Sequence, residues 1–478
     1  MTIDVRPDGV AVVTVTAPPA PRGRFRETVG EEIERLVARL DDDSRSVGAV
    51  LLLRGTDASR AVSDIGALGR MAFASDGEQA ARHFAGAVGR LAGASKPIVA
   101  AVEGDVLGAD FELALACRAI VASDEASTIV ALPDVHLGLL PSGNGLLRVA
   151  LHAGLRVALD LGLSGRSIGS TEAHRMKLVH DVRPTAALVD EAARRVRELA
   201  APGGPSKGRA RQRAWSDNVL ARKLTLRRAR LAVRASTRGH SLASERIVEL
   251  LAEYSRRGFD AAADLEARSF GDLVVTEASR RLVELAATRV AFGPTVPRRS
   301  AAEIASHLSS TSNSYARRIL TPYLREASLL VAEGTSAPKV DQALLDWGWS
   351  VGPLELLDEL DLGVDARPTT ASSAAPSKSL ASEEIQLRCM LPLLNEAAQC
   401  LADGVIASPG DGDVDAVMAL GFPPVRGGPF RYIDAVGPVE LLRRTRAYEA
   451  RFGERASPRA ALIARAGSGE RYYAIERG

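Results

Sequence analysis

The chain has 478 residues, long enough for several domains, and its 61 Lys and Arg nearly balance its 59 Asp and Glu, giving a net charge of +2. This balance gives no indication of a nucleic-acid-binding or membrane-binding protein. Hydrophobic residues make up 46% of the chain and charged residues 25%, which is ordinary for a globular protein and excludes wholesale disorder. The cysteines, Cys117, Cys389 and Cys400, have no metal-type spacing and fit a reducing compartment.

We expect neither a signal peptide nor a membrane span. The N-terminus has no basic segment followed by an apolar stretch. The apolar stretches of the chain are broken by Arg, Asp or Gly well short of the roughly 18 residues that a membrane span needs. We therefore predict a cytoplasmic protein.

The first predicted elements are strands over residues 10–16 and 47–53, with a helix over 26–40 between them. Further strands are predicted over 97–103 and 118–122, separated by a helix-compatible stretch at 112–117. Alternating strands and helices, with continuous apolar strands, indicate an α/β domain whose sheet is largely parallel.

From residue 185 to about 290 the pattern is helical and rich in Arg. Ten Lys and Arg lie between Lys207 and Arg234, against one acid, Asp217. A surface for nucleic acid or for the phosphates of coenzyme A is one interpretation, and a solvated helix face is the other. Leu and Ala at helical spacing favour the second interpretation, as does the absence of an aromatic stacking pattern.

The C-terminal third contains an internal repeat, flanked by linker-like segments at 292–314 and 366–382. Residues 316–334 align with a segment that ends at Gly404. Four pairs lie 70 positions apart: Pro322 and Pro392, Glu326 and Glu396, Ala327 and Ala397, Gly334 and Gly404. Further along, Val340 and Asp341 align with Val414 and Asp415, and each copy has a Gly-Pro corner. A duplicated all-helical domain is the expectation.

Two carboxylates in apolar surroundings are the candidate chemical groups of the α/β domain. Glu112 follows a Gly-containing turn at 104–110, and Asp134 precedes a Gly-rich turn at 141–145. Buried carboxylates can act as general acid and base, and amides at a helix start can stabilise an enolate oxygen. A lone Glu after a turn is, however, more often a capping or surface residue.

The same segments resemble the crotonase (enoyl-CoA hydratase/isomerase) superfamily. The similarity lies in three segments: Gly104 to Cys117, Leu132 to Gly145, and residues 159–182. It implies catalytic roles for Glu112 and Asp134, with Gly108 and the amides of Ser63 and Ala109 binding the thioester oxygen. This sequence has Asp134 where the family has Glu, and Asp110 beside the oxyanion turn.

The helical repeat resembles the C-terminal domain of 3-hydroxyacyl-CoA dehydrogenases, so nearly the whole chain resembles the multifunctional fatty-acid β-oxidation enzyme. The resemblance implies a crotonase-like domain at 1–190, helical connecting region at 191–300, and helical repeats at 301–370 and 371–478. The short stretch between Arg289 and Ala316 has no room for a dinucleotide-binding domain and contains no GxGxxG text. The Asn expected at the start of the repeat helix is replaced by Arg317.

The resemblance implies a lyase that reversibly hydrates trans-2-enoyl-CoA to 3-hydroxyacyl-CoA in fatty-acid metabolism. The alternatives are enoyl-CoA isomerisation or another specialised crotonase reaction, and a non-catalytic subunit of an acyl-CoA complex. We expect no metal and no cofactor, since coenzyme A enters as part of the substrate. No NAD is expected because the phosphate-binding turn of a dinucleotide domain is missing. The expected partners are the acyl-CoA thioester and a second copy of the chain or a thiolase-like protein, with no nucleic acid.

Overall fold

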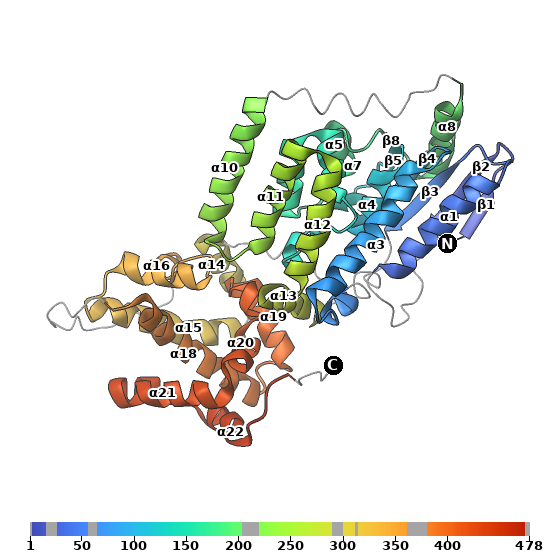
Figure 1. Ribbon diagram of the computed structural model, residues 1–478. Coiled ribbons are helices and arrows are strands. Elements are labelled where there is room, and N and C mark those ends of the chain that lie inside the picture. The colour runs from blue at the N-terminus through green and yellow to red at the C-terminus, as the bar shows by residue number, and fades with distance from the viewer. Residues whose placement is uncertain are drawn as a thin grey trace. The chain divides into compact units, whose positions relative to one another are not determined.

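The computed structural model describes residues 2–15, 26–55, 65–202, 219–288, 300–310, 314–360 and 380–473. These residues form two compact units (Figure 1). The first comprises the described residues up to Val283, and the second comprises those from Glu284 onward. The first unit thus contains the predicted α/β domain together with most of the connecting helices. The boundaries predicted at 190, 300 and 370 stay predictions.

An eight-stranded sheet forms the centre of the first unit, in the order β1-β2-β3-β4-β5-β8, with β6 pairing to β4 and β7 to β6. Strands β2 to β5 and β8 are parallel, and β1 and β7 pair antiparallel with their neighbours. The predicted largely parallel sheet is confirmed. The strands are β1 (Thr2–Val5), β2 (Val10–Val15), β3 (Gly48–Gly55), β4 (Ile98–Leu107), β5 (Ala119–Ser123), β6 (Ile129–Ala131), β7 (Ile168–Gly169) and β8 (Asp181–Arg183).

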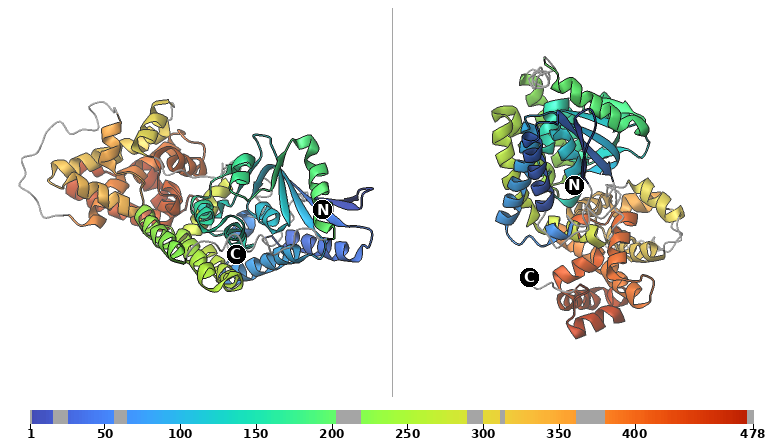
Figure 2. Two further views of the ribbon diagram at one scale, coloured as in Figure 1. Left: turned by 90° about the horizontal axis from the view of Figure 1, so that it is seen from above. Right: turned by 90° about the vertical axis from the view of Figure 1, so that its right-hand side faces the viewer.

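Both faces of the sheet are covered, which explains why its strands are continuous apolar runs. Alternate residues of β3 point to opposite sides, so that Leu51 packs in the larger core and Val50 and Leu52 in the smaller one. Helices α1 (Glu27–Asp42) and α3 (Ala74–Gly93) supply buried side chains to the larger core, and α8 (Leu188–Ala200) packs on the other face. The left view of Figure 2 shows these helices on opposite sides of the sheet.

The helices that carry the candidate site lie between β4 and β8 along the chain. The apolar content of α4 and α5 makes these two largely buried helices, and Phe111 and Leu146 are both fully buried. The first helix of the set begins three residues before the helical stretch predicted at 112–117 and ends one residue before its last residue, Cys117. They are α4 (Ala109–Ala116), η1 (Pro133–Leu137), α5 (Gly145–Ala153), α6 (Leu155–Ser164) and α7 (Ser170–Arg175), followed by η2 (Thr185–Ala187) before α8.

The helices described between residues 219 and 288 are α10 (Val219–Thr237), α11 (Leu242–Arg257), α12 (Phe259–Val274) and α13 (Glu277–Thr288). The first three lie side by side in Figure 1, and α12 also packs against α3. Their buried faces, including Ile247 and Phe270, belong to the larger core. The helices predicted as a connection are therefore part of the structure that surrounds the site.

The second unit is helical, as the repeat predicted. It contains α14 (Ala301–Ser310), α15 (Ser314–Ala332), α16 (Ala337–Trp347), α17 (Pro353–Glu359), α18 (Ser382–Ala402), α19 (Pro409–Leu420), η4 (Pro424–Arg426), α20 (Pro429–Val436), α21 (Pro438–Phe452), η5 (Gly453–Ala456) and α22 (Ala460–Ser468). The predicted linker at 292–314 was wrong in part, because α14 lies within it. Of the predicted linker at 366–382, residues 366–379 lie outside the described residues.

The repeat relates α15 to α18 by reciprocal ion pairs. Arg388 of α18 pairs with Glu326 of α15 at 2.5 Å, and Arg318 of α15 pairs with Glu396 of α18 at 2.5 Å. Both members of the second pair lie 70 positions from their counterparts in the first. The two long helices thus contact each other through equivalent residues, which is the contact expected of a duplicated element related by a two-fold axis.

One detail of the predicted repeat alignment was wrong. Asp341 accepts a hydrogen bond at 2.8 Å from the amide of Leu354, which follows the Gly352-Pro353 corner. In the second copy Asp413, not Asp415, accepts the equivalent bond, at 2.7 Å from the Phe430 amide. The sequence alignment matched the Val-Asp pair, but the structure matches the carboxylate that holds the corner.

No helix among the described residues is long and apolar enough to cross a membrane.

Candidate active site

The turn between β4 and α4 places a helix start beside the carboxylates. Gly108 has φ 53° and ψ −120°, in the positive-φ region that favours glycine. Ala109 is the first residue of α4, so its amide N–H has no acceptor within the helix. Asp110 is half-buried in the first helical turn, where a negative charge is favourable. Ser63, the other predicted oxyanion residue, lies outside the described residues.

Glu112 is fully buried in the first turn of α4. Its Oε1 accepts hydrogen bonds from the amides of Gly143, at 2.7 Å, and Gly145, at 3.0 Å. Glycine is required at both positions by this close approach. A Cβ on Gly143 would lie 2.6 Å from the Phe84 ring, and one on Gly145 would lie 2.8 Å from Cγ of Glu112.

Asp134 lies in η1 and faces the same place in the core. Its side chain is 7% exposed. Oδ1 pairs with the guanidinium of Arg26 at 3.4 Å, whereas Oδ2 is buried and makes no hydrogen bond to the described residues. Asp134 therefore keeps one oxygen available as a hydrogen-bond acceptor.

Arg26 joins the two carboxylates, and no sequence pattern singled it out. Its Nη1 donates to Oε2 of Glu112 at 2.8 Å and to Oγ of Ser142 at 2.9 Å, and its Nη2 contacts Oδ1 of Asp134. The side chain is 6% exposed and lies over the Phe84 ring, 5.1 Å from its centre. Arg26 precedes α1 in the left-handed region, with φ 53° and ψ 8°.

These neighbours set the proton affinity of Glu112. Burial raises its pKa to about 7, although Arg26 lowers it, Asp134 raises it, and the amides of Gly143 and Gly145 lower it. A carboxyl group with a pKa near neutrality can both accept and release a proton at physiological pH. The arrangement therefore suits general acid/base chemistry.

A third carboxyl group belongs to the same cluster. Glu266, on α12, is 1% exposed, and its Oε1 accepts a hydrogen bond at 2.6 Å from the amide of Asn144. Burial first, and then the charge of Glu112, raises its pKa well above the usual value. The sequence analysis assigned the segment containing Glu266 to the helical connecting region, and a single Glu on an amphipathic helix gave no signal of a site.

The structure thus brings Glu112, Asp134, Gly108 and Ala109 together in one region, and the roles implied for them stay predictions. Arg26 and Glu266 were missed. Arg26 was placed at the start of the helix predicted over 26–40, where an Arg is unremarkable. Its contacts with α4 and η1 depend on residues 86 and 108 positions away.

Two protein families match different parts of the chain. Residues 6–243 match the enoyl-CoA hydratase/isomerase family. The N-terminal region has the crotonase fold. Residues 315–384 match the C-terminal domain of 3-hydroxyacyl-CoA dehydrogenase, in the helical second unit. The predicted fold class, a crotonase-like domain followed by a helical dehydrogenase-type region, is confirmed.

Relatives are similar over the whole chain. The fatty acid oxidation complex subunit alpha of Shewanella amazonensis is 24% identical over 701 positions, covering 98% of this chain and 99% of the relative. The protein of the same description from Vibrio parahaemolyticus is 23% identical over 698 positions, covering 99% of each. A crystal structure of enoyl-CoA hydratase from Bacillus anthracis is 19% identical, covers 52% of this chain and 89% of that chain, and has a TM-score of 0.37.

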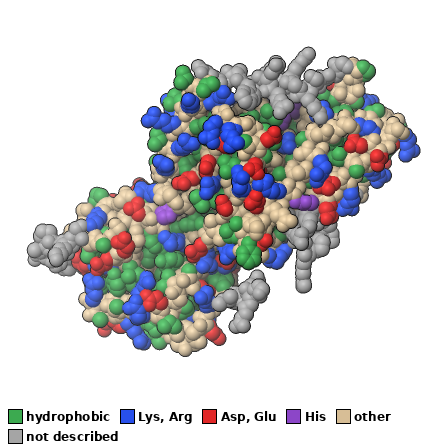
Figure 3. All heavy atoms as spheres, in the orientation of Figure 1, with side chains coloured by type: hydrophobic (Ala, Val, Ile, Leu, Met, Phe, Trp, Pro, Cys, Tyr) green, Lys and Arg blue, Asp and Glu red, His purple; other side chains and the backbone are tan. Residues whose placement is uncertain are grey.

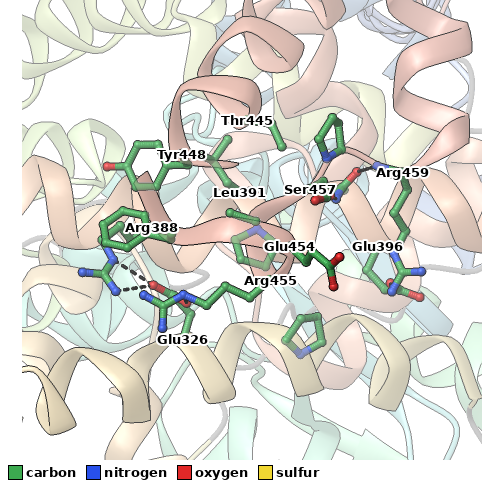
Figure 4. A pocket seen from close by; sticks show the side chains of 16 residues that line it. Glu326, Arg388, Leu391, Glu396, Thr445, Tyr448, Glu454, Arg455, Ser457 and Arg459 are labelled. Atoms are coloured by element: carbon green, nitrogen blue, oxygen red, sulfur yellow. Dashed lines mark hydrogen bonds and ion pairs between the residues drawn. The ribbon is translucent and has the colours of Figure 1, made fainter. Parts of the chain in front are cut away.

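The second unit contains a cavity of about 290 Å³ between α15, α18 and α21 (Figure 4). Its charged walls pair with one another: Arg388 with Glu326, and Arg459 with Glu396 at 2.5 Å. The Phe452 ring packs 4.3 Å from the Arg388 guanidinium. Because these charges satisfy each other, the lining does not select a ligand of either sign.

The basic segment predicted from the sequence corresponds in part to α10. Lys223, Arg227 and Arg228 are exposed, whereas Leu226 and Val233 are buried against the crotonase domain. Figure 3 shows blue Lys and Arg side chains on the visible face around this helix. This arrangement is that of a solvated helix face. Nowhere in the described parts of the chain are three or more His, Cys, Asp or Glu side chains grouped to hold a metal ion.

Proposed function

We propose that the crotonase domain catalyses the reversible hydration of a trans-2-enoyl-CoA to a 3-hydroxyacyl-CoA. The observation that carries the proposal is the meeting of Glu112 and Asp134 in one buried site beside the α4 start. Their hydrogen bonds differ, because both oxygens of Glu112 are held while Oδ2 of Asp134 makes no hydrogen bond to the described residues. This difference supports separate roles for the two groups.

In the proposed reaction, the amide of Ala109 donates to the thioester oxygen and stabilises the negative charge of the enolate. The amide of Ser63 is the second donor implied by the family resemblance. Asp134 accepts a hydrogen bond from the attacking water through Oδ2. Water adds its oxygen to C3 as one of its O–H bonds breaks, and the released proton passes to the ionised form of Glu112, whose pKa is about 7. Glu112 then gives this proton to C2 of the enolate, so that the net change is the addition of one water and Glu112 returns to its starting state. The reaction needs no metal and no redox cofactor.

The decisive experiment is a spectrophotometric assay of crotonyl-CoA hydration with the purified full chain. Glu112→Gln is expected to lower the rate by about 10²–10⁴-fold while substrate binding, measured by calorimetry, is retained. Glu125→Gln, a change of the same kind at an exposed position, is the control and should keep the full rate. A Glu112→Gln variant with most of the rate would show that Glu112 is structural.

Double-bond isomerisation, or another crotonase reaction that needs one acid/base group, is the second candidate. The position of Arg26 favours it, because a guanidinium bound to both carboxylates competes with a water molecule for their oxygens. Conversion of a 3-enoyl-CoA in the absence of hydration would select this candidate. Activity on neither substrate would support the remaining alternative, a non-catalytic subunit of an acyl-CoA complex.

We also propose that the chain lacks a dinucleotide-binding domain and has no 3-hydroxyacyl-CoA dehydrogenase activity. The alignment with the Shewanella amazonensis relative spans 701 positions, whereas this chain has 478 residues, a difference of more than 200 positions and of domain size. Arg317, at the position where an Asn was expected, donates to the Leu308 carbonyl at 2.6 Å. Tight NADH binding in a calorimetric titration would overturn this proposal. The cytoplasmic location, self-association and a thiolase-like partner stay predictions.

A further inference from the structure

Three successive amides hold two buried carboxyl groups that come from different helices. Gly143 and Gly145 donate to Oε1 of Glu112, and Asn144, between them, donates to Oε1 of Glu266. The turn ends at α5, and Asn144 adopts a left-handed conformation with φ 64°. The backbone of this turn is therefore fixed from the α4 side by Glu112 and from the α12 side by Glu266.

Glu266 has an environment that disfavours its charged form. Its Oε2 is buried and makes no hydrogen bond to any residue that the structure describes. Burial raises its pKa, Glu112 and Asp134 raise it further, and the Asn144 amide and Arg148 of α5 only partly oppose this. An uncharged carboxyl group still accepts the Asn144 hydrogen bond through its carbonyl oxygen.

Some of the charged groups on α12 and on the helices packed against it pair with residues other than Glu266. Arg82 of α3 pairs with Glu78 and with Asp264 of α12. Glu253 of α11 pairs with Arg256 and Arg257 on its own helix. The charged groups that shift the pKa of Glu266 are Glu112 and Asp134, which raise it, and Arg148, which lowers it.

We propose that Glu266 is a positioning residue, which in its uncharged form anchors the 143–145 turn so that the turn's other two amides hold the Glu112 carboxylate. The role of Glu112 in catalysis rests on the proposed function, but the anchoring does not. Glu266 accepts its hydrogen bond from the Asn144 amide, in the backbone of the turn. It acts through the backbone of the turn, and it gives α12 a direct part in the site.

Two variants separate this role from a simple charge effect. Glu266→Gln keeps a carbonyl acceptor for the Asn144 amide and is expected to rescue most of the rate that Glu266→Leu loses, with the pH profile of the wild type. Glu266→Leu removes the acceptor and loosens the turn, so that Glu112 loses hydrogen bonds that lower its pKa. We expect the Glu112 limb of the pH–rate profile to rise by about one pH unit, and kcat to fall about 10²-fold with KM nearly unchanged.

The alternatives give different results. If Glu266 were ionised, Glu266→Gln would remove a negative neighbour and lower the Glu112 limb, which would overturn the proposal. A folded Glu266→Leu variant with an unchanged limb would also overturn it.

Two further measurements need no enzymatic activity. They test the proposal even if the wild-type protein is inactive or the Glu266→Leu variant fails to fold. In infrared difference spectra at pH 8, wild type minus Glu266→Gln should show a protonated carboxyl band, and its absence would overturn the proposal. The Glu112 titration, followed by carboxyl-carbon NMR in the wild type and the Gln variant, should be the same. An inactive wild type that passes both measurements would sink the proposed function and leave the anchoring in place.

Discussion

Nη1 of Arg26 lies 2.8 Å from Oε2 of Glu112, and both side chains are buried. Removing either partner of such a pair leaves an uncompensated buried charge or forces the remaining group to become neutral. For Glu112 the second route is open, because burial has already raised its pKa to about 7. Arg26 is the largest of the influences that lower the pKa of Glu112 and, with the amides of Gly143 and Gly145, keeps a fraction of it ionised near neutral pH.

Arg26→Ala is expected to raise the pKa of Glu112 further. A hydrogen bond to a charged group contributes about 1.5–3 kcal/mol, which corresponds to a rise of about one to two pH units. The limb of the pH–rate profile that reports Glu112 should move upward by that amount, and Arg26→Lys should move it less because the positive charge remains. An unmoved limb in the Ala variant would show that Arg26 does not act on Glu112.

Asp134→Glu tests whether the second carboxylate has retreated from the water. The longer side chain advances its oxygens by roughly 1–1.5 Å. If a displacement of about 1 Å limits hydration, the variant should hydrate a short enoyl-CoA up to roughly 10²-fold faster. If the pocket has closed around the Asp and Arg26, the variant should instead lose about 1–3 kcal/mol of stability and its native activity. Rate and melting temperature together distinguish the two outcomes.

The stability of the protein should fall as pH rises through the pKa of Glu112. Glu112 binds its proton more tightly in the folded protein than in the unfolded protein, where its pKa is 4.5. Its contribution to the free energy of unfolding is therefore fully present below pH 4.5. Between pH 4.5 and 7 it is lost progressively, by up to about 3 kcal/mol. Asp413 of the second unit, with a pKa raised to about 7 by burial, acts in the same direction. Glu112→Gln should therefore reduce the pH dependence in urea titrations, and an identical dependence would argue against the raised pKa.

The repeat supplies a matched pair of ion-pair variants. Glu326→Ala leaves Arg388, whose side chain is 2% exposed, with Glu333 at 2.7 Å as a remaining partner, whereas Glu396→Ala leaves Arg318, whose side chain is 33% exposed and can be solvated, with Asp403. We expect the first to destabilise the second unit by about 2 kcal/mol, because buried guanidinium donors lose their acceptor, and the second by about 1 kcal/mol. Trp347 and Trp349, two of the three tryptophans, lie in this unit, so their fluorescence reports its unfolding in urea. Equal losses would show that burial does not distinguish the pairs.

The sequence by itself determined the elements whose signal is local. The apolar stretches at 47–53 and 97–103 form β3 and β4, because continuous β-branched and apolar residues suit a strand covered on both faces. The texts around Glu112 and Asp134 indicated a crotonase domain, since several spaced motifs agree in order. The spacing of 70 positions indicated the helical duplication before any contact between α15 and α18 was known.

The tertiary structure alone decided the electrostatics of the site. The pKa of Glu112 depends on Arg26, which lies 86 positions earlier, and on amides more than 30 positions later. Glu266 accepts a hydrogen bond from an amide that lies 122 positions away in the chain. It belongs to a helix that the sequence analysis placed in the connecting region. An Arg before a helix or a Glu within one is ordinary in sequence. Because these side chains are buried next to one another, each shifts the pKa of its neighbours. No local sequence pattern indicates this proximity.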